Sequence, residues 1–270
     1  PSNQFNHVIV CLPISNDTIW MECTSQEIPF GYLGDFTDDR DVLVVSENSF
    51  IAHTKKYDYN NNVTVTNAEM DIDKDGNASF LINQSYQALS SEMMSSIYNY
   101  YTTAEQAQKI SDLFYFKNIQ VDNFKFVMEK DSIQRLNFSA RLICREYASK
   151  TTNRFFIPLN QIHPFIYKHH SDTNRLQPVV EQRNFTQVDT IAIKIPANYS
   201  AETTDFTNTL VSEFGEYTLS LKKQADKFIV TRKLIFKANT FSAAQYAKRS
   251  AFFKELALLD AQRLVLKKQP

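Results

Sequence analysis

One stretch of the chain alternates between polar and apolar side chains so regularly that it leaves little choice of backbone. Within residues 134–147, polar and apolar side chains alternate at every position from Arg135 to Leu142. The polar set is Arg135, Asn137, Ser139 and Arg141, and the apolar set is Leu136, Phe138, Ala140 and Leu142. Successive side chains of a strand point to opposite faces of a sheet, so this period of two predicts a half-buried antiparallel strand.

Other segments indicate the same class of fold. Residues 63–87 read as a strand, an Asp-rich turn that contains Gly76, and a second strand, which predicts a hairpin. Residues 90–117 have a helical period, and Thr103 with Gln106 has the spacing of a capping box that would divide the segment into two short helices. Another helix is predicted to begin at Ser242. The chain is therefore predicted to be mainly β with a few helices (α+β).

The sequence predicts three units. The polar run YDYNNN at residues 57–62 marks the end of the first unit, residues 1–58. Residues 59–175 are expected to form a β-rich module with a helical insertion, and residues 176–270 a β-rich C-terminal module that ends in a helix and a strand. Both modules are expected to be antiparallel and β-sandwich-like. Whether residues 59–270 form one domain or two stays open.

Composition excludes several classes of function. Only 4 of 270 residues are glycine, and the glycine-rich loops that cradle phosphates are absent. The 29 basic and 30 acidic side chains leave a net charge of −1, which argues against a nucleic-acid partner. No apolar run approaches the roughly 18–20 residues of a transmembrane segment. The three cysteines lack any CxxC spacing, so neither a disulfide framework nor a structural zinc site is expected.

Two motifs resemble metal sites but favour other interpretations. Asp71, Asp73 and Asp75 begin like a calcium-binding loop, yet the position that should hold a bidentate Glu is Ile82. We therefore interpret this segment as a hairpin turn. A histidine cluster, His163 with His169 and His170, lies in a segment without a helical zinc motif, and we interpret it as a polar loop. No metal and no cofactor is predicted.

The strongest signal for chemistry lies near the N-terminus. His7 opens one predicted strand, and Glu22 lies near the end of the next. Antiparallel neighbours bring such side chains side by side. A carboxylate orients an imidazole and favours its charged form, as general acid–base catalysis requires. Taken alone, a surface His and an edge Glu explain the same residues.

The residues around this pair resemble a known family. The run FNHVIVCLPISNDTIWMECTSQEIPFGYLGDF is similar to the second half of a bacterial transglutaminase-like core, in the papain-like superfamily of cysteine proteases. In such cores a Cys at a helix N-terminus is followed by a His strand and then by an acid strand. The resemblance implies that His7 is the catalytic histidine and Glu22 its acid. Asp17 is a second, lower-ranked acidic candidate because it lies at the turn.

The C-terminal part carries a second resemblance. The run EFGEYTLSLKKQADKFIVTRKLIFKANTFSAAQYAKRSAFFKEL is similar to the C-terminal module of bacterial proteins that flank a transglutaminase-like core with β-rich domains of unknown function. Such proteins carry secretion or lipoprotein signals. The resemblance therefore implies an extracytoplasmic location, in the periplasm or at the cell surface.

One departure from the family concerns the nucleophile. The family's Cys precedes its His by several dozen residues, so the resemblance predicts a nucleophilic Cys upstream of Pro1 in a longer protein. Cys11 follows His7 on the same predicted strand, and Cys23 should face away from its neighbour Glu22. These 270 residues are thus predicted to be non-catalytic by themselves, as the C-terminal part of an amide hydrolase or acyltransferase that acts on a peptide or protein.

The alternative is a binding or scaffolding module for a peptide, glycan or protein partner, with a dead transglutaminase-like core. Two observations discriminate between the hypotheses. A preformed half-site requires the His7 and Glu22 side chains within about 3.2 Å of each other. A binding module requires a concave patch on residues 59–270, and the loop from His163 to His170 is one place to look for it.

Overall fold

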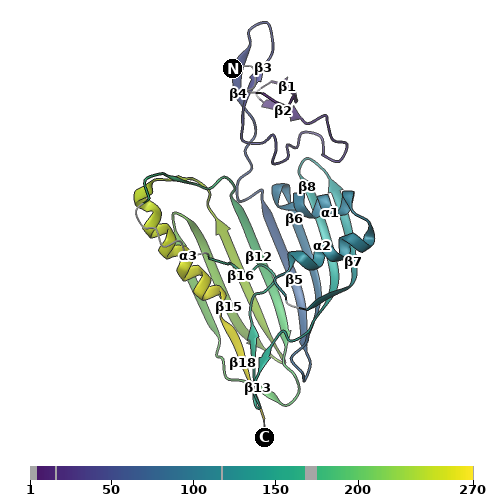
Figure 1. Cartoon of the computed structure of the whole chain (residues 1–270), viewed down its shortest axis with the longest axis vertical. Coiled ribbons are helices and arrows are strands. Elements are labelled where there is room, and N and C mark those ends of the chain that lie inside the picture. The colour runs from purple at the N-terminus through teal and green to yellow at the C-terminus, as the bar shows by residue number, and fades with distance from the viewer. Residues whose placement is uncertain (1–4, 16, 117, 168–174, 270) are drawn as a thin grey trace.

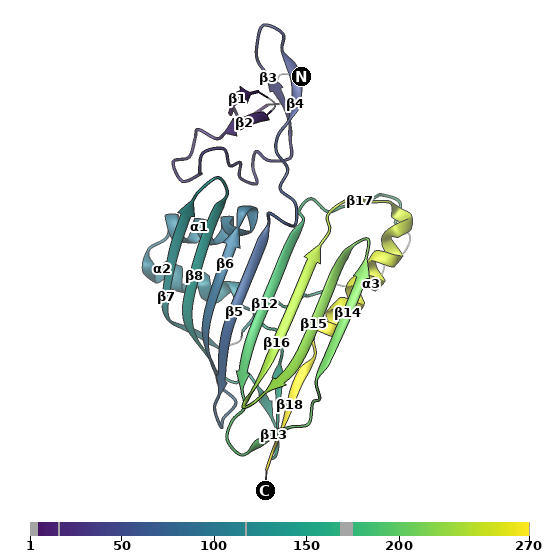
Figure 2. The ribbon, with the colours of Figure 1, turned by 180° about the vertical axis from the view of Figure 1, so that it is seen from behind.

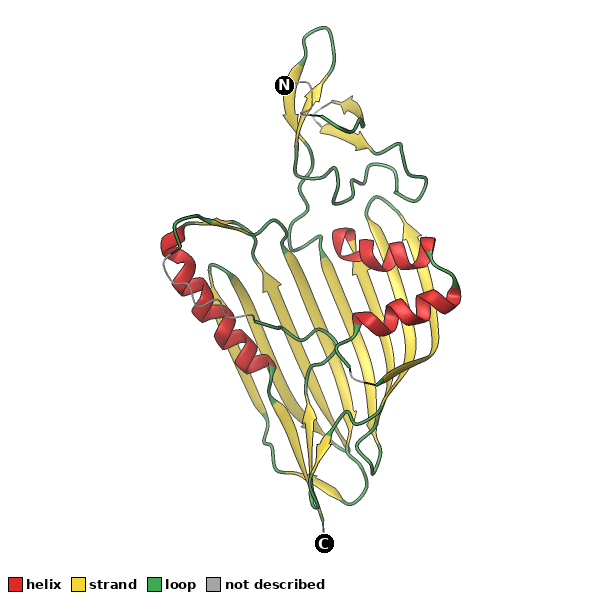
Figure 3. Cartoon of the chain, viewed as in Figure 1, coloured by secondary structure: helices red, strands yellow, loops and turns green. Residues whose placement is uncertain are grey.

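The computed structural model describes residues 5–15, 17–116, 118–167 and 175–269. Most of the regular structure in these residues is β-strand. Three α-helices in the described residues lie on one face of a large sheet (Figures 1 and 3). The prediction of a mainly β chain with a few helices is confirmed.

An eight-stranded sheet forms the body of the molecule (Figure 2). Its strands lie in the order β14-β15-β16-β12-β5-β6-β8-β7. They are β5 (Val63–Ile72), β6 (Ala78–Gln87), β7 (Ile119–Lys130), β8 (Gln134–Cys144), β12 (Phe185–Lys194), β14 (Phe206–Ser212), β15 (Gly215–Gln224) and β16 (Lys227–Phe236). The apolar side chains of the covered face form one continuous core.

The segment with alternating polar and apolar side chains forms strand β8, as its period of two predicts. In β8, Leu136, Phe138 and Leu142 are almost completely buried, whereas the polar residues between them face outward. The predicted hairpin of residues 63–87 is formed by β5 and β6. Its turn needs Gly76, which has φ +87°, because a Cβ atom there would lie 2.7 Å from the carbonyl oxygen of Ala148.

The two halves of the sheet meet at a parallel pair. Strands β5 and β12 run in the same direction, with Val63 opposite Thr186 and Met70 opposite Ile193. The second and third predicted units each contribute four strands to this sheet. One hydrogen-bonded sheet therefore joins residues 59–175 to residues 176–270, the relation that the sequence left open.

Residues 88–113 cover one half of the sheet with a short 3₁₀ turn, η1 (Ala88–Ser91), and two helices, α1 (Glu92–Tyr100) and α2 (Thr103–Leu113). The expected division into two helices is present, but the capping box is one residue earlier than predicted. Thr102 caps α2, and the Glu105 side chain accepts the Thr102 N–H at 2.9 Å. The two helices bury Met94, Ile97 and Ile110 against the sheet.

The C-terminal segment covers the other half. The predicted capping box at Ser242 and Gln245 is present in η2 (Ala243–Gln245), which leads into α3 (Tyr246–Asp260). A four-stranded sheet in the order β13-β18-β10-β9 packs into the same core as α3. Its strands are β9 (Ser149–Lys150), β10 (Arg154–Pro158), β13 (Tyr199–Ala201) and β18 (Arg263–Lys268). Two further strands, β11 (Val179–Val180) and β17 (Thr240–Phe241), pair with each other.

Residues 5–58 lie beyond one end of the large sheet (Figure 1). They contain two hairpins, formed by β1 (Val10–Ile14) with β2 (Asp17–Met21) and by β3 (Asp41–Val44) with β4 (Phe50–His53). These hairpins enclose a small second core built on Trp20, Tyr32, Leu33, Tyr57 and Ala88. No helix of the described residues is long and apolar enough to cross a membrane.

Candidate functional site

His7 and Glu22 lie next to each other at one end of the first hairpin. The register of β1 and β2 pairs Val10 with Met21, so His7 precedes the paired part of the hairpin and Glu22 directly follows it. The Nε2 atom of His7 lies 2.6 Å from Oε2 of Glu22, within hydrogen-bonding distance. The structure thus brings together the two residues that the sequence selected. Asp17, the lower-ranked acid, is at the turn, where its carboxylate accepts the Thr18 N–H.

The Glu22 carboxylate is fixed on both of its oxygens. Oε1 accepts hydrogen bonds from the N–H of Thr24 at 2.9 Å and from the Thr24 hydroxyl at 2.7 Å, while Oε2 contacts His7. The side chain is only 5% exposed. Burial alone would raise the pKa of Glu22, but the bonds from Thr24 and His7 outweigh it and hold the pKa below its usual range. Glu22 is therefore ionised at neutral pH.

The other ring nitrogen of His7 is available for chemistry. Among the described residues, Nδ1 of His7 has no hydrogen-bond partner, because Glu22 occupies Nε2. The ring packs edge-on against Phe36, with ring centroids 4.9 Å apart. It lines a surface pocket of about 310 Å³ that Phe5, Phe36 and Arg40 also border. His7 can thus exchange a proton through Nδ1 with a group that enters this pocket.

A second histidine of the same unit, His53, has carboxylates at both ring nitrogens. Asp41 contacts Nδ1 of His53 at 2.8 Å, and Asp39 contacts Nε2 at 2.9 Å. These hydrogen bonds raise the pKa of His53 above its usual value. The side chain is 54% exposed, and both ring nitrogens are occupied by carboxylates. His53 is therefore a surface ion-pair residue and a natural control for His7.

None of the three cysteines hydrogen-bonds to His7 within the described residues. Cys11 is half-buried on β1, where its backbone pairs with that of Trp20. Cys23 is exposed, and its Sγ points to the carbonyl oxygen of Met21. Cys144 lies in the core, where burial raises its pKa to about 12 and keeps the thiol protonated. The described residues thus hold a base and an acid without a paired thiol.

The remaining motifs have structural roles in the described residues. Asp73 closes the β5–β6 turn by accepting the N–H groups of Asp75 and Asn77. No group of three or more metal-binding side chains occurs in the described part of the chain. Trp20 is 9% exposed and belongs to the small second core. His169 and His170 lie outside the described residues.

His163 takes part in a buried network that the sequence did not reveal. Its Nδ1 lies 2.9 Å from Asp189, which pairs with Arg232 at 3.0 Å. Arg232 also donates to Asp260 at 2.7 Å, and both side chains are about 1–2% exposed. A possible signal was a charged residue at an inward position of each strand, since Asp189 and Arg232 alternate with Ile191 and Val230.

Comparisons with known proteins give a family match for part of the chain. Residues 153–266, from β10 to β18, match a family described as a domain of unknown function with a solved structure, DUF3858. A search of curated proteins found no significant match. A crystal structure of a "putative protease" from Parabacteroides distasonis aligns with 77% of this chain and 100% of its own, at 7% identity and a TM-score of 0.32. Similarity at that level carries no argument about fold or activity.

Proposed function

We propose that residues 1–58 supply the general base and its orienting acid to a Cys–His–acid site of the transglutaminase-like type. His7 is the base, Glu22 is the acid, and the nucleophilic Cys belongs to a part of the protein outside these 270 residues. The reaction is hydrolysis of a peptide amide, or transfer of its acyl group to an amine. The observation that carries the proposal is the 2.6 Å contact between His7 and Glu22.

The geometry of the pair suits each proton transfer in such a reaction. Nδ1 of His7 takes the thiol proton, and the thiolate attacks the amide carbon. The C–N bond then breaks, and the imidazolium returns its proton to the leaving amine. Water or a second amine then attacks the thioester and gives a proton to His7. The C–S bond breaks, and the imidazolium returns that proton to the departing thiolate. Throughout, the ionised Glu22 stabilises the imidazolium and keeps the ring in one orientation.

The exposed apolar face of the first hairpin is a second observation in favour of a larger surrounding domain. Four apolar side chains alternate along one side of the segment that forms β1, and all of them are more than 40% exposed. They are Val8, Val10, Leu12 and Ile14. Contiguous exposed apolar surface of this kind marks an interface that another element covers. The face is therefore compatible with packing against the part of the protein that would carry the nucleophile.

A second candidate function is a binding module whose transglutaminase-like core is dead. A groove beside His163 on the helical face of the sheet favours it, and this groove is described below. The two functions are compatible within one protein. The extracytoplasmic location implied by the family resemblance belongs to the same proposal, and fractionation of native cells tests it.

The proposal is tested by labelling thiols in the complete protein that contains these residues. Brief treatment with iodoacetamide at pH 6 should modify one cysteine outside residues 1–270 much faster than any other, because a thiol paired with an imidazole is ionised at that pH. Mass spectrometry identifies the site. Cys11 and Cys23, which lack such a partner, serve as internal references.

Two outcomes would overturn the proposal. In one, the complete protein contains no cysteine that reacts faster than Cys23, the exposed thiol. In the other, a fast cysteine exists, but its reaction rate does not change when His7 is replaced by asparagine.

A further inference from the structure

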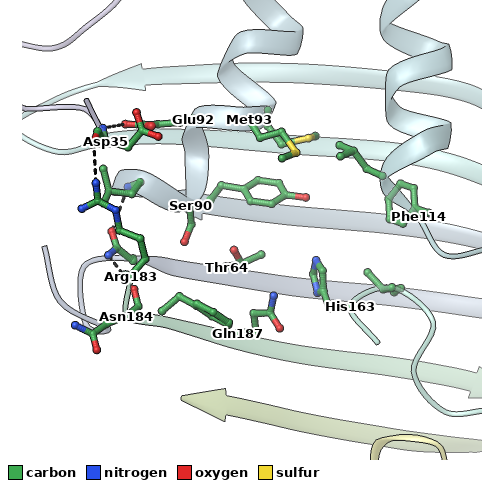
Figure 4. A pocket seen from close by; sticks show the side chains of 17 residues that line it. Asp35, Thr64, Ser90, Glu92, Met93, Phe114, His163, Arg183, Asn184 and Gln187 are labelled. Atoms are coloured by element: carbon green, nitrogen blue, oxygen red, sulfur yellow. Dashed lines mark hydrogen bonds between the residues drawn. The ribbon is translucent and has the colours of Figure 1, made fainter. Parts of the chain in front are cut away.

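A groove of about 480 Å³ opens between the end of the large sheet and the elements that cover it. Figure 4 shows its side chains, with Glu92, Asp35 and Arg183 at one end and Phe114 and His163 at the other. Strands β5, β6 and β12 contribute to it, as do α1 and α2. Its volume lies in the range of sites that hold small organic molecules or short peptides.

One end of the groove is apolar. Met94, Phe114 and Ile162 line it and are almost fully buried, and Leu113 borders it with a partly exposed side chain. Met93 stands at the rim, where 63% of its surface is exposed. A ligand in this part of the groove would gain affinity by burying an aliphatic or aromatic group.

The other end presents two acids. Oε1 of Glu92 accepts hydrogen bonds from the Tyr32 hydroxyl at 3.2 Å and from the N–H of Asp35 at 2.9 Å. Burial, followed by the charge of the Asp35 carboxylate, raises the pKa of Glu92 to about 7. The Asp35 side chain also hydrogen-bonds to the Glu92 carboxyl. This end of the groove thus holds the Asp35 side chain next to a Glu92 carboxyl that is close to half-protonated at neutral pH.

Acidic groups also outnumber basic groups around the groove as a whole. Arg183 is already neutralised, because it donates to Asp38 at 2.6 Å and to the carbonyl oxygen of Asp35 at 2.7 Å. The groups that line the groove, or form ion pairs beneath it, comprise more carboxyls than basic side chains: Asp35, Asp38, Glu92, Asp189 and Asp260 against Arg183, Arg232 and His163. The local potential therefore attracts cations and repels carboxylate or phosphate ligands.

We propose that this groove binds an amphipathic cation, in the form of a short peptide with a Lys or Arg side chain next to an apolar side chain. The cation lies against Asp35 and Glu92, and the apolar side chain lies between Leu113, Phe114 and Ile162. The cavity and its apolar wall exist independently of the acids, so the site does not rest on their charge alone. The assignment is also independent of catalysis by His7.

The test uses the 270-residue protein and two capped dipeptides of nearly equal shape, acetyl-Leu-Lys-amide and acetyl-Leu-norleucine-amide. Isothermal titration at pH 7 should show binding of the lysine peptide at least about tenfold tighter than binding of the norleucine peptide, because only the first places a charge on the acids. Equal affinity for the two peptides, or no binding of either, would overturn the proposal.

The titration should also detect the release of protons when the peptide binds. A cation favours the ionised form of Glu92, so binding at pH 7 should release protons, and the measured heat should differ between phosphate and Tris buffers. Affinity should rise as the pH rises through about 7, the pKa of Glu92. The neighbours that face this carboxyl are Tyr32, Asp35 and Arg183 with its partner Asp38.

Three variants separate binding from stability. Glu92→Gln should weaken binding of the lysine peptide by about tenfold and abolish the proton release. Asp35→Asn keeps the hydrogen bond from the backbone N–H of residue 35 to Glu92 and should also weaken binding of the lysine peptide. This variant tests the acidic end of the groove if Glu92→Gln does not fold. Leu113→Trp should block the apolar end. Glu69→Gln, on the exposed opposite face of β5, is the matched control. Unchanged affinity in folded Asp35→Asn and Leu113→Trp proteins would contradict the site.

Discussion

Replacing Asp260 with alanine is expected to lower the free energy of unfolding by about 3–5 kcal/mol. Asp260 accepts hydrogen bonds from Nε of Arg232 at 2.7 Å, from the Tyr217 hydroxyl at 2.7 Å and from the N–H of Phe165 at 2.6 Å. Arg232 is 1% exposed, so the variant leaves a buried guanidinium that Asp189 alone must balance. Urea denaturation monitored by circular dichroism measures the loss.

Two further variants test whether the lost negative charge causes the loss of stability. Asp260→Asn keeps the shape and loses the charge, so it should be less destabilising than Asp260→Ala. Glu255→Ala removes an exposed acid from the same helix, α3, and should change the free energy of unfolding by less than about 0.5 kcal/mol. A cost below about 1 kcal/mol for Asp260→Ala would show that the buried ion pairs contribute little to the stability of the fold.

In the complete protein, Glu22→Gln is expected to slow alkylation of the nucleophilic cysteine at pH 6 by at least about tenfold. The ionised Glu22 carboxylate lies 2.6 Å from the His7 ring, so it orients the ring and stabilises the positive charge that His7 acquires with the thiol proton. Glutamine fills the same space and can still accept the hydrogen bonds from Thr24, so the loss isolates the charge. The measurement is the pseudo-first-order rate with iodoacetamide.

Glu47→Gln is the matched control for this effect, because Glu47 is an exposed acid on the turn between β3 and β4 of the same unit. Its alkylation rate should equal that of the wild type. An unchanged rate in Glu22→Gln would mean that the His7–Glu22 contact has no part in activating a thiol.

Patterns that are local in the sequence predicted the structure well. The alternation in β8, the β5–β6 hairpin and the Ser242 capping box each depend on residues a few positions apart, and the structure contains them all. Capping at α2 was placed one residue late, because Thr102 with Glu105 and Thr103 with Gln106 have the same chemistry and spacing. Only the extended backbone after Tyr100 makes Thr102 the cap.

Features that join distant parts of the chain were not predictable in this way. The parallel pair of β5 and β12 connects residues more than 100 positions apart, and no turn sets its register. The partners of Arg232 come from β12 and from the end of α3. A charged residue at an inward strand position is therefore the only local signal of the ion pairs, and it does not identify their partners or the groove above them. The sequence could place His7 next to Glu22 because a single hairpin joins them, and their catalytic roles stay a prediction from the family resemblance.

The most direct test of the proposed half-site is the pH dependence of thiol alkylation in the complete protein, compared between the wild type, His7→Asn and His53→Asn. In the wild type, the reactive cysteine should be half-ionised well below pH 8. His7→Asn should move this midpoint to about 8.5, the value of a free thiol, and His53→Asn should leave it in place. Identical profiles for the wild type and His7→Asn would contradict the assignment of His7 as the base.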